Sequence, residues 1–170
     1  IGSSGQFVIG QIDPAGTVTA TAGGSIYYDA VDDLHVQLVS STSGDVSLTA
    51  DSSILDQTLA DSASDIRGNS VTLIATLGTV GELGNEVNVD SRRNGVGTLN
   101  AAATQDIYVI EAAGDMVLGT VGTPQNAYLE AYSGNITNGL GSGANVTATN
   151  TWLGASAGIA IAPGDGSEVE

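Results

Sequence analysis

Val46-Ser47-Leu48-Thr49-Ala50 and Val71-Thr72-Leu73-Ile74-Ala75 decide how this sequence is interpreted, together with similar stretches at 18–22 and 146–150. In each, apolar residues alternate with mostly small or hydroxyl-bearing ones, which is typical of a β-strand with one buried face. The first three stretches begin at Val18, Val46 and Val71, at spacings of 28 and 25 residues. Similar short strands that return at such spacings predict a solenoid that repeats a small β-unit.

The composition favours the same fold. The 170 residues include 24 glycines, three prolines, one phenylalanine, one tryptophan and one methionine. A sandwich of this length would normally place more aromatic residues at its centre, whereas a solenoid stacks small aliphatic side chains in a narrow channel. Frequent glycine and asparagine supply the sharp corners that such a chain needs.

The charge excludes several classes of partner. Lys+Arg number 3 and Asp+Glu number 19, giving a net charge of −16, and the cations are Arg67, Arg92 and Arg93. Nucleic acid and anionic membranes would be repelled, because phosphate binding depends on Lys and Arg. The chain has no cysteine for disulfides and no apolar run long enough for membrane insertion. We interpret the acidity as a means of solubility, with calcium binding as the alternative.

An alignment at an offset of 20 residues predicts that one coil lies directly on the next. The aligned pairs are Asp106/Asn126, Tyr108/Tyr128, Val109/Leu129, Gly114/Gly134, Asp115/Asn135 and Met116/Ile136. With 20 to 25 residues per turn, the chain would form about seven or eight coils. The predicted strands span 17–22, 25–30, 34–40, 45–50, 70–76, 86–90, 97–102, 106–111, 115–121, 126–133, 145–151 and 158–162.

Two tandem immunoglobulin-like β-sandwiches are the alternative fold. Ser43-Gly44-Asp45-Val46-Ser47 and Ser133-Gly134-Asn135-Ile136-Thr137 are 90 residues apart, about the length of one such domain. The shorter repeats favour the solenoid, because a sandwich has no reason to contain them. We therefore treat 1–170 as a single solenoid segment. Its glycine- and serine-rich start and uncapped acidic end predict an internal fragment of a larger repetitive protein.

Several phrases resemble the repeats of filamentous-haemagglutinin-like large exoproteins, which are giant bacterial surface proteins. They are Gly44-Asp45-Val46-Ser47-Leu48-Thr49-Ala50, Ser53-Ile54-Leu55-Asp56, Asp65-Ile66-Arg67-Gly68-Asn69-Ser70-Val71-Thr72-Leu73 and Gly97-Thr98-Leu99-Asn100-Ala101. The resemblance covers about residues 16 to 162. It implies a right-handed parallel β-helix, secreted or held at the cell surface, with a role in adhesion, biofilm or fibre formation. It supplies no active site.

Candidate metal ligands are confined to one acidic stretch. Asp51, Asp56, Asp61 and Asp65 fall within fifteen residues in the longest predicted loop. Oxygen ligands in a loop suit calcium, but neither a helical calcium loop nor a glycine-rich nonapeptide repeat is present. Asp as a turn former is the competing interpretation. We likewise expect the aspartates of Gly44-Asp45 and Gly114-Asp115 to bond their local backbone.

Tyrosines form the candidate contact surface. In 127–132, alternation places Leu129 and two alanines inside and Tyr128 and Tyr132 outside, with Tyr108 one coil away from Tyr128. Exposed aromatic side chains could stack on surface glycans or on another chain, or pack across coils. The pattern assigns Trp152 to neither the core nor the surface.

The search for catalytic residues favours a non-enzymatic protein. His35, the single histidine, should face away from Leu34, Val36 and Leu38, and a Ser-His-Asp arrangement with Asp32 or Asp33 has little support. Parallel β-helices also include polysaccharide-degrading enzymes, but Arg92-Arg93-Asn94-Gly95 has the composition of a turn. We expect a rigid structural or adhesive rod that joins other copies end to end, with a calcium- or glycan-binding module and an enzyme as alternatives.

Overall fold

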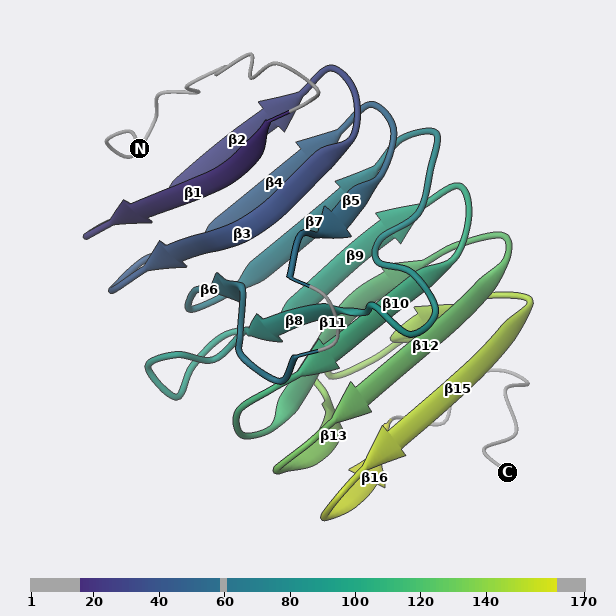
Figure 1. Ribbon diagram of the computed structural model, residues 1–170. Helices are drawn as coiled ribbons and strands as arrows, with labels where there is room; N and C mark the ends of the chain where they lie inside the picture. The colour runs from purple at the N-terminus through teal and green to yellow at the C-terminus, as the bar shows by residue number, and fades with distance from the viewer. Residues whose placement is uncertain (1–15, 59–60, 162–170) are drawn as a thin grey trace.

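The fold is an all-β parallel solenoid of about six turns, described here from a computed structural model (Figure 1). The structure describes residues 16–58 and 61–161. Each turn contributes to two sheets, sheet A and sheet B, and each sheet has a continuous path of seven strands within the described residues. The sequence predicts seven or eight coils, slightly more than are observed.

Each sheet has eight strands within the described residues. Those of sheet A are β1 (Thr17–Ala22), β3 (Leu34–Ser41), β5 (Ile54–Asp56), β6 (Ile66–Arg67), β8 (Val87–Asp90), β10 (Ile107–Glu111), β12 (Asn126–Ala131) and β15 (Asn150–Ala155). Sheet B contains β2 (Ile26–Ala30), β4 (Val46–Ala50), β7 (Val71–Ala75), β9 (Leu99–Ala103), β11 (Met116–Gly122), β13 (Asn135–Asn138), β14 (Val146–Thr147) and β16 (Gly158–Ala160).

Every pairing between these strands is parallel, which contradicts the alternative of two antiparallel sandwiches. The alignment at an offset of 20 is confirmed, because Tyr108 pairs with Tyr128 and Met116 pairs with Ile136. The expectation that successive coils lie directly on one another is therefore correct over this part of the chain.

The prediction that the four valine-led stretches are equivalent strands is correct for two of them. Val46 and Val71 are register partners in sheet B, as predicted. Val18 lies in sheet A, where it pairs with Val36, and Val146 pairs with β11 rather than with β7. The two sheets require the same inward-facing pattern of apolar residues, so that pattern alone does not tell one sheet from the other.

The core is a column of aliphatic side chains between the two sheets. Its largest fully buried members are Ile26, Leu34, Leu48, Ile54, Ile66, Leu73, Leu99, Ile107, Met116, Leu118, Leu129 and Ile136. None of them is aromatic. Burying one such side chain contributes roughly 1.5–3 kcal/mol, so the stability of the solenoid grows with the number of coils.

Aspartates at the corners join one coil to the next. Asp45 Oδ1 accepts a hydrogen bond of 3.0 Å from the backbone N–H of Ser70. Asp115 Oδ1 accepts one of 2.9 Å from the N–H of Asn135. The expectation that these aspartates bond their local backbone is therefore wrong, because each carboxylate accepts from the backbone of the next coil.

A bulge in β3 changes which residues face the core. The register of β1 against β3 shifts after Val18, so that Thr19 pairs with Leu38 and Gln37 has no partner in β1. As a result Val39 is buried and Leu38 is only partly buried. Strict alternation, which predicted Leu38 on the inner face, fails because one extra residue reverses the faces of those that follow.

Candidate functional site

Two loops leave the outer face of sheet A at the same place in consecutive coils. Ile54 of β5 pairs with the first half of β3 and Ile66 of β6 with the second half, so this strand of the sheet is interrupted between Asp56 and Ile66. The described residues of this first loop are 57–58 and 61–65. In the next coil Val80 forms bridges to Ile54 and Ile107, and the strand resumes only in β8. Residues 81–86 form the second loop, which lies beside the first in front of sheet A (Figure 1).

Hydrogen bonds tie each loop to the strand next to the other loop. Asn85 Nδ2 donates to the backbone oxygen of Asp56 at 3.0 Å, and Asn88 Nδ2 donates to that of Asp61 at 3.1 Å. Gly81 has a φ of +74°, and a Cβ atom at this position would collide with the carbonyl oxygen of Tyr108. Glycine is therefore required where the second loop leaves the sheet.

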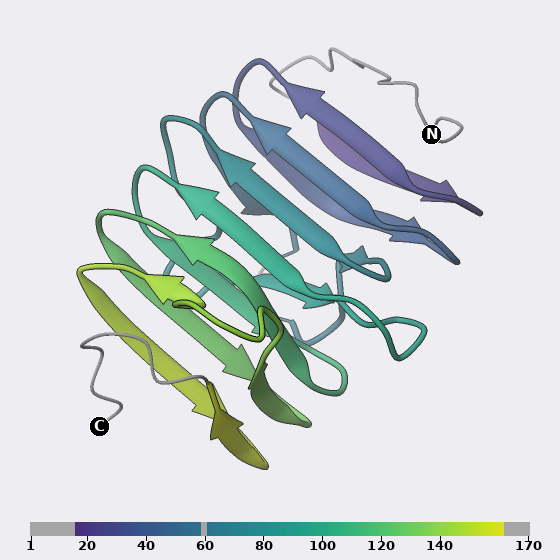
Figure 2. The same cartoon turned by 180° about the vertical axis from the view of Figure 1, so that it is seen from behind.

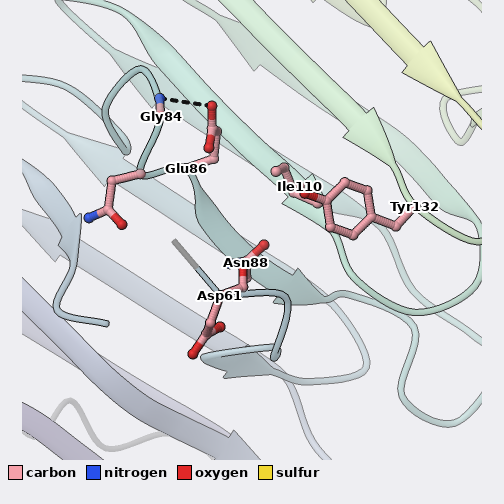
Figure 3. A pocket seen from close by; sticks show the side chains of 7 residues that line it. Asp61, Gly84, Glu86, Asn88, Ile110 and Tyr132 are labelled. Carbon is pink, nitrogen blue, oxygen red and sulfur yellow. Dashed lines mark hydrogen bonds between the residues drawn. The ribbon is translucent and has the colours of Figure 1, made fainter. Parts of the chain in front are cut away.

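A pocket of about 150 Å³ lies between the loops and the sheet. It is lined by Asp61, Gly84, Asn85, Glu86, Asn88, Ile110 and Tyr132 (Figure 3). Glu86 Oε1 accepts a 3.0 Å hydrogen bond from Gly84 N, which fixes the side chain against its own loop. The pocket thus combines two carboxylates and two amides with an aliphatic and an aromatic side chain.

A pair of acidic side chains closes the neck of the first loop. Asp56 Oδ1 accepts hydrogen bonds from Thr58 N at 2.7 Å and Thr58 Oγ1 at 2.9 Å, and the same hydroxyl lies 3.2 Å from Asp65 Oδ1. Burial, with the negative charges of Asp56 and Asp61, raises the pKa of Asp65 to about 7. Burial also raises the pKa of Asp56. The pair therefore favours retaining a proton that an exposed aspartate would release.

The four predicted calcium ligands are not arranged as one group. Asp56, Asp61 and Asp65 belong to the first loop and its neck, while Asp51 is exposed in the corner after β4. Within 16–58 and 61–161, no three His, Cys, Asp or Glu side chains are grouped in a way that could hold a metal ion. Calcium binding by these residues stays a prediction.

The predicted surface tyrosines begin an aromatic ladder on the outer face of sheet A. The rings of Tyr108 and Tyr128 are 6.3 Å apart and tilted by 38°. Trp152 is the register partner of Tyr128 and stacks on it, with ring centroids 4.0 Å apart and parallel planes. Tyr132 is exposed, as expected, but lines the pocket instead. We refer to Tyr108, Tyr128 and Trp152 as the aromatic ladder.

Sequence reasoning left the position of Trp152 open because its coil is longer than the preceding one. The offset from Tyr128 to Trp152 is 24 residues rather than 20. Asn126 and Asn150 could have revealed the alignment, since each precedes its aromatic residue by two positions and Asn150 Nδ2 donates to Asn126 Oδ1 at 2.8 Å.

His35 and its neighbours do not form a catalytic triad. Asp33 Oδ1 accepts a 2.9 Å hydrogen bond from Ser53 N, and a hydrogen bond from the Ser52 side chain is the main cause of the lowered pKa of Asp33. Among the described residues, no hydrogen bond joins His35 to a serine. The prediction that Arg92-Arg93-Asn94-Gly95 forms a turn is confirmed, with Arg92 donating to Gly95 O at 2.6 Å. Arg67 Nε donates to Ser64 O at 2.7 Å.

One buried carboxyl was not foreseen. Glu111 at the end of β10 is 0% exposed, and its carboxylate accepts hydrogen bonds from the backbone N–H and the hydroxyl of Ser91. Burial raises the pKa of Glu111 to about 8 despite these bonds. Period-two alternation places the residue on the inner face, but a glutamate gives no sign in the sequence that it will remain buried.

No protein-family model matches the chain, and neither a curated protein nor a solved structure is similar to it. Of the resemblance to large bacterial exoproteins, the structure supports the parallel β-solenoid. A search of the described residues for a helix with the length and apolar character to span a bilayer identifies none.

Proposed function

We propose that this chain is a non-enzymatic rod segment of a large secreted or cell-surface bacterial protein, with a role in adhesion, biofilm or fibre formation. The observation that carries the proposal is the continuous path of seven parallel strands in sheet B, from β2 to β16. Each coil in such an array is held mainly by its two neighbours, so that the coils resist bending together. Six turns at about 4.8 Å per strand correspond to a rod of roughly 30 Å.

The acidic surface supports a location outside the cell or at its surface. A strongly negative rod repels nucleic acid and anionic lipid, and it keeps neighbouring rods apart. Within this proposal the partners are further coils or other copies of the chain joined end to end, because parallel strands at the end of a stack can pair with another strand. Surface glycans are the proposed ligands of the aromatic ladder, where Trp152 is 47% exposed.

The rod proposal can be tested by replacement in the organism that produces the complete protein. We expect an unrelated solenoid with the same number of coils to restore attachment or biofilm strength, and a flexible Gly/Ser linker of equal residue number to fail. Antibodies against the segment should label intact cells. Equal function with the flexible linker would contradict a mechanical role, and labelling only after lysis would contradict the surface location.

A glycan-binding module is the second candidate, favoured by the aromatic ladder. Aromatic side chains on a sheet face can stack on sugar rings, and the second loop leaves the sheet beside Tyr108 at one end of the ladder. Trp152→Ala should then reduce binding to extracted surface polysaccharide, whereas Ile74→Ala, an exposed change on sheet B, should not. Equal retention of both variants would exclude the ladder as the binding surface.

A further inference from the structure

The pocket between the two loops offers hydrogen-bond acceptors, while its amide nitrogens are engaged inside the protein. Asn85 Nδ2 donates to Asp56 O, and Asn88 Nδ2 donates to Asp61 O. Glu86 uses one carboxylate oxygen to accept from Gly84 N. The lining therefore suits a ligand that brings donors rather than acceptors.

Asn88 indicates most specifically that the pocket lacks a hydrogen-bond donor. The residue is only 3% exposed, and its Oδ1 atom is buried and accepts no hydrogen bond in the part of the chain that the structure describes. An amide oxygen left in this condition destabilises the fold, because it has given up its hydrogen bonds to water without gaining another. Figure 3 shows the Asn88 oxygen pointing to the side of the pocket where Glu86 and Ile110 lie. A donor placed in the pocket could satisfy it.

Charge adds a preference for a cationic donor. Asp61 and Glu86 line the pocket, and Glu130 is the register partner of Ile110. Burial, followed by the charges of Glu130 and Glu86, raises the pKa of Tyr132. No Arg or Lys is among the seven lining residues. The Tyr132 ring is 43% exposed and can place its electron-rich face against a cation.

We propose that this pocket binds a primary alkylammonium group, whose nitrogen donates to Asn88 Oδ1 and Glu86 while its alkyl stem packs against Ile110 and Tyr132. An ammonium group has three donors and no acceptor, matching the lining. A volume of about 150 Å³ accommodates a short alkyl chain, since a water molecule accounts for about 30 Å³ in the liquid. The chain contains no lysine, so another copy cannot supply a lysine side chain.

The test is a titration of the whole chain followed by NMR, at low and constant ionic strength. We expect n-butylammonium to bind saturably with a Kd on the order of millimolar, and to shift the Asn88 side-chain amide and the signals of residues 84–88. The neutral probe n-butanol should bind at least about tenfold more weakly, because it has no charge for Glu86. Equal binding of the two probes, or no saturation with the ammonium probe, would overturn the proposal.

A matched pair of charge variants distinguishes binding in the pocket from attraction by the overall negative charge of the protein. Glu86→Gln should weaken n-butylammonium binding about tenfold, whereas Glu82→Gln, in the same loop but outside the lining, should change it less than about twofold. Equal losses in the two variants would contradict a specific site. If Glu86→Gln disturbs the loop, Tyr132→Leu provides the second test and should also weaken binding.

Further probes identify the source of the ammonium group. The probe Nα-acetyl-lysine-N-methylamide, with a free side-chain ammonium group, stands for a partner polypeptide. Putrescine stands for a free polyamine and glucosamine for an amino sugar. The proposal expects tight binding from at least one alkylammonium compound, and weaker binding of glucosamine, whose amine is attached to a ring. Preferential binding of glucosamine would replace the alkylammonium assignment with an amino-sugar site. The inference does not depend on the mechanical role of the rod.

Discussion

The outer faces of the two sheets differ, although the same coils build both. In sheet B, β4 pairs with β7 and β7 with β9 over five consecutive residues each, without interruption. In sheet A, the strand opposite β3 is divided into β5 and β6, and the next coil is divided between Val80 and β8 (Figures 1 and 2). Figure 2 shows sheet B in front, whose own division comes only later in the chain, where β13 and β14 share the place opposite β11.

The difference teaches how a thin solenoid can accommodate loops. A coil that is interrupted in sheet A remains paired in sheet B, so its position along the column is retained. In the coils that carry the two loops, sheet B thus provides the continuous support, and the pocket and the aromatic ladder lie on the outer face of sheet A. Binding residues are commonly placed on loops that a rigid scaffold positions.

The largest expected effect comes from a substitution that creates a cavity beneath sheet B. Leu73 in β7 is 0% exposed, so Leu73→Ala should lower the free energy of unfolding by about 2–5 kcal/mol. Ile74→Ala, the neighbouring change on the outer face, should cost under about 1.5 kcal/mol, because that side chain is already partly solvated. Chemical denaturation measures both. Similar losses for the two variants would contradict sheet B as a one-sided support.

A substitution at Gly97 tests the close backbone packing just before β9, where the chain enters sheet B. Gly97 has a φ of +131° and packs so closely that a Cβ atom would overlap the carbonyl oxygen of Asn69. Gly97→Ala should cost at least about 2–3 kcal/mol, since strain and collision add. Gly95→Ala is the control: its φ is +77°, no atom lies within 4 Å, and the cost should be about 1–2 kcal/mol. Equal melting temperatures for the variants would contradict the close packing.

The buried carboxyls predict a solenoid that loses stability as the pH rises. Folded Glu111, with a pKa of about 8, holds a proton that the unfolded chain releases near pH 4.5. The free energy of unfolding should therefore fall between pH 4.5 and 8, by at most about 1.4 kcal/mol per pH unit for this group. Asp65, with a pKa of about 7, acts in the same direction.

Glu111→Gln is the variant that tests this pH dependence. The change should leave stability near pH 4 almost unaltered and reduce the slope between pH 5 and 8, with Asp65 supplying the remainder. Denaturant midpoints at several pH values measure the slope. An unchanged slope would show that Glu111 does not hold the proton. Asp33 and Asp115 have lowered pKa values and should destabilise the fold only upon acidification below about pH 4.

The smallest expected effect concerns the aromatic ladder. A double-mutant cycle of Tyr128→Leu and Trp152→Leu should give a coupling energy of about 0.5–1.5 kcal/mol, because the rings stack at 4.0 Å. The cycle of Tyr108→Leu with Trp152→Leu is the control and should give almost none, since these residues lie two coils apart. Equal coupling in both cycles would contradict direct stacking.

Regular coil length determined which parts of the fold could be predicted. Between β10 and β12 the offset is 20 residues, and there the alignment identified the register partners correctly. The loops change the spacing, so that Val39 and Ile66 are 27 residues apart and yet adjacent in the sheet. Strands β5 and β6, with three and two residues, are too short for alternation to reveal, and both were missed.

The candidate site was harder to predict than the fold. Alternation assigned Tyr128 and Tyr132 to the outer face correctly, because facing depends on local pattern. It could not show that Asn88 lines one pocket with Asp61 and Tyr132, because these three residues come from different coils. The acidic stretch was noticed as a set of metal ligands, but its sequence did not show that Asp56 and Asp65 would be buried next to Thr58, where burial raises the pKa of both carboxyls.

The corner aspartates also bear on the order in which the coils can form. The carboxylates of Asp33, Asp45, Asp106 and Asp115 each accept from a backbone N–H that lies 20 to 25 residues later. During synthesis from the amino end, each of these four acceptors therefore emerges ahead of its donor. A coil that has already folded therefore offers hydrogen-bond acceptors to the coil that follows. Adding coils one at a time needs no rearrangement of the coils already formed.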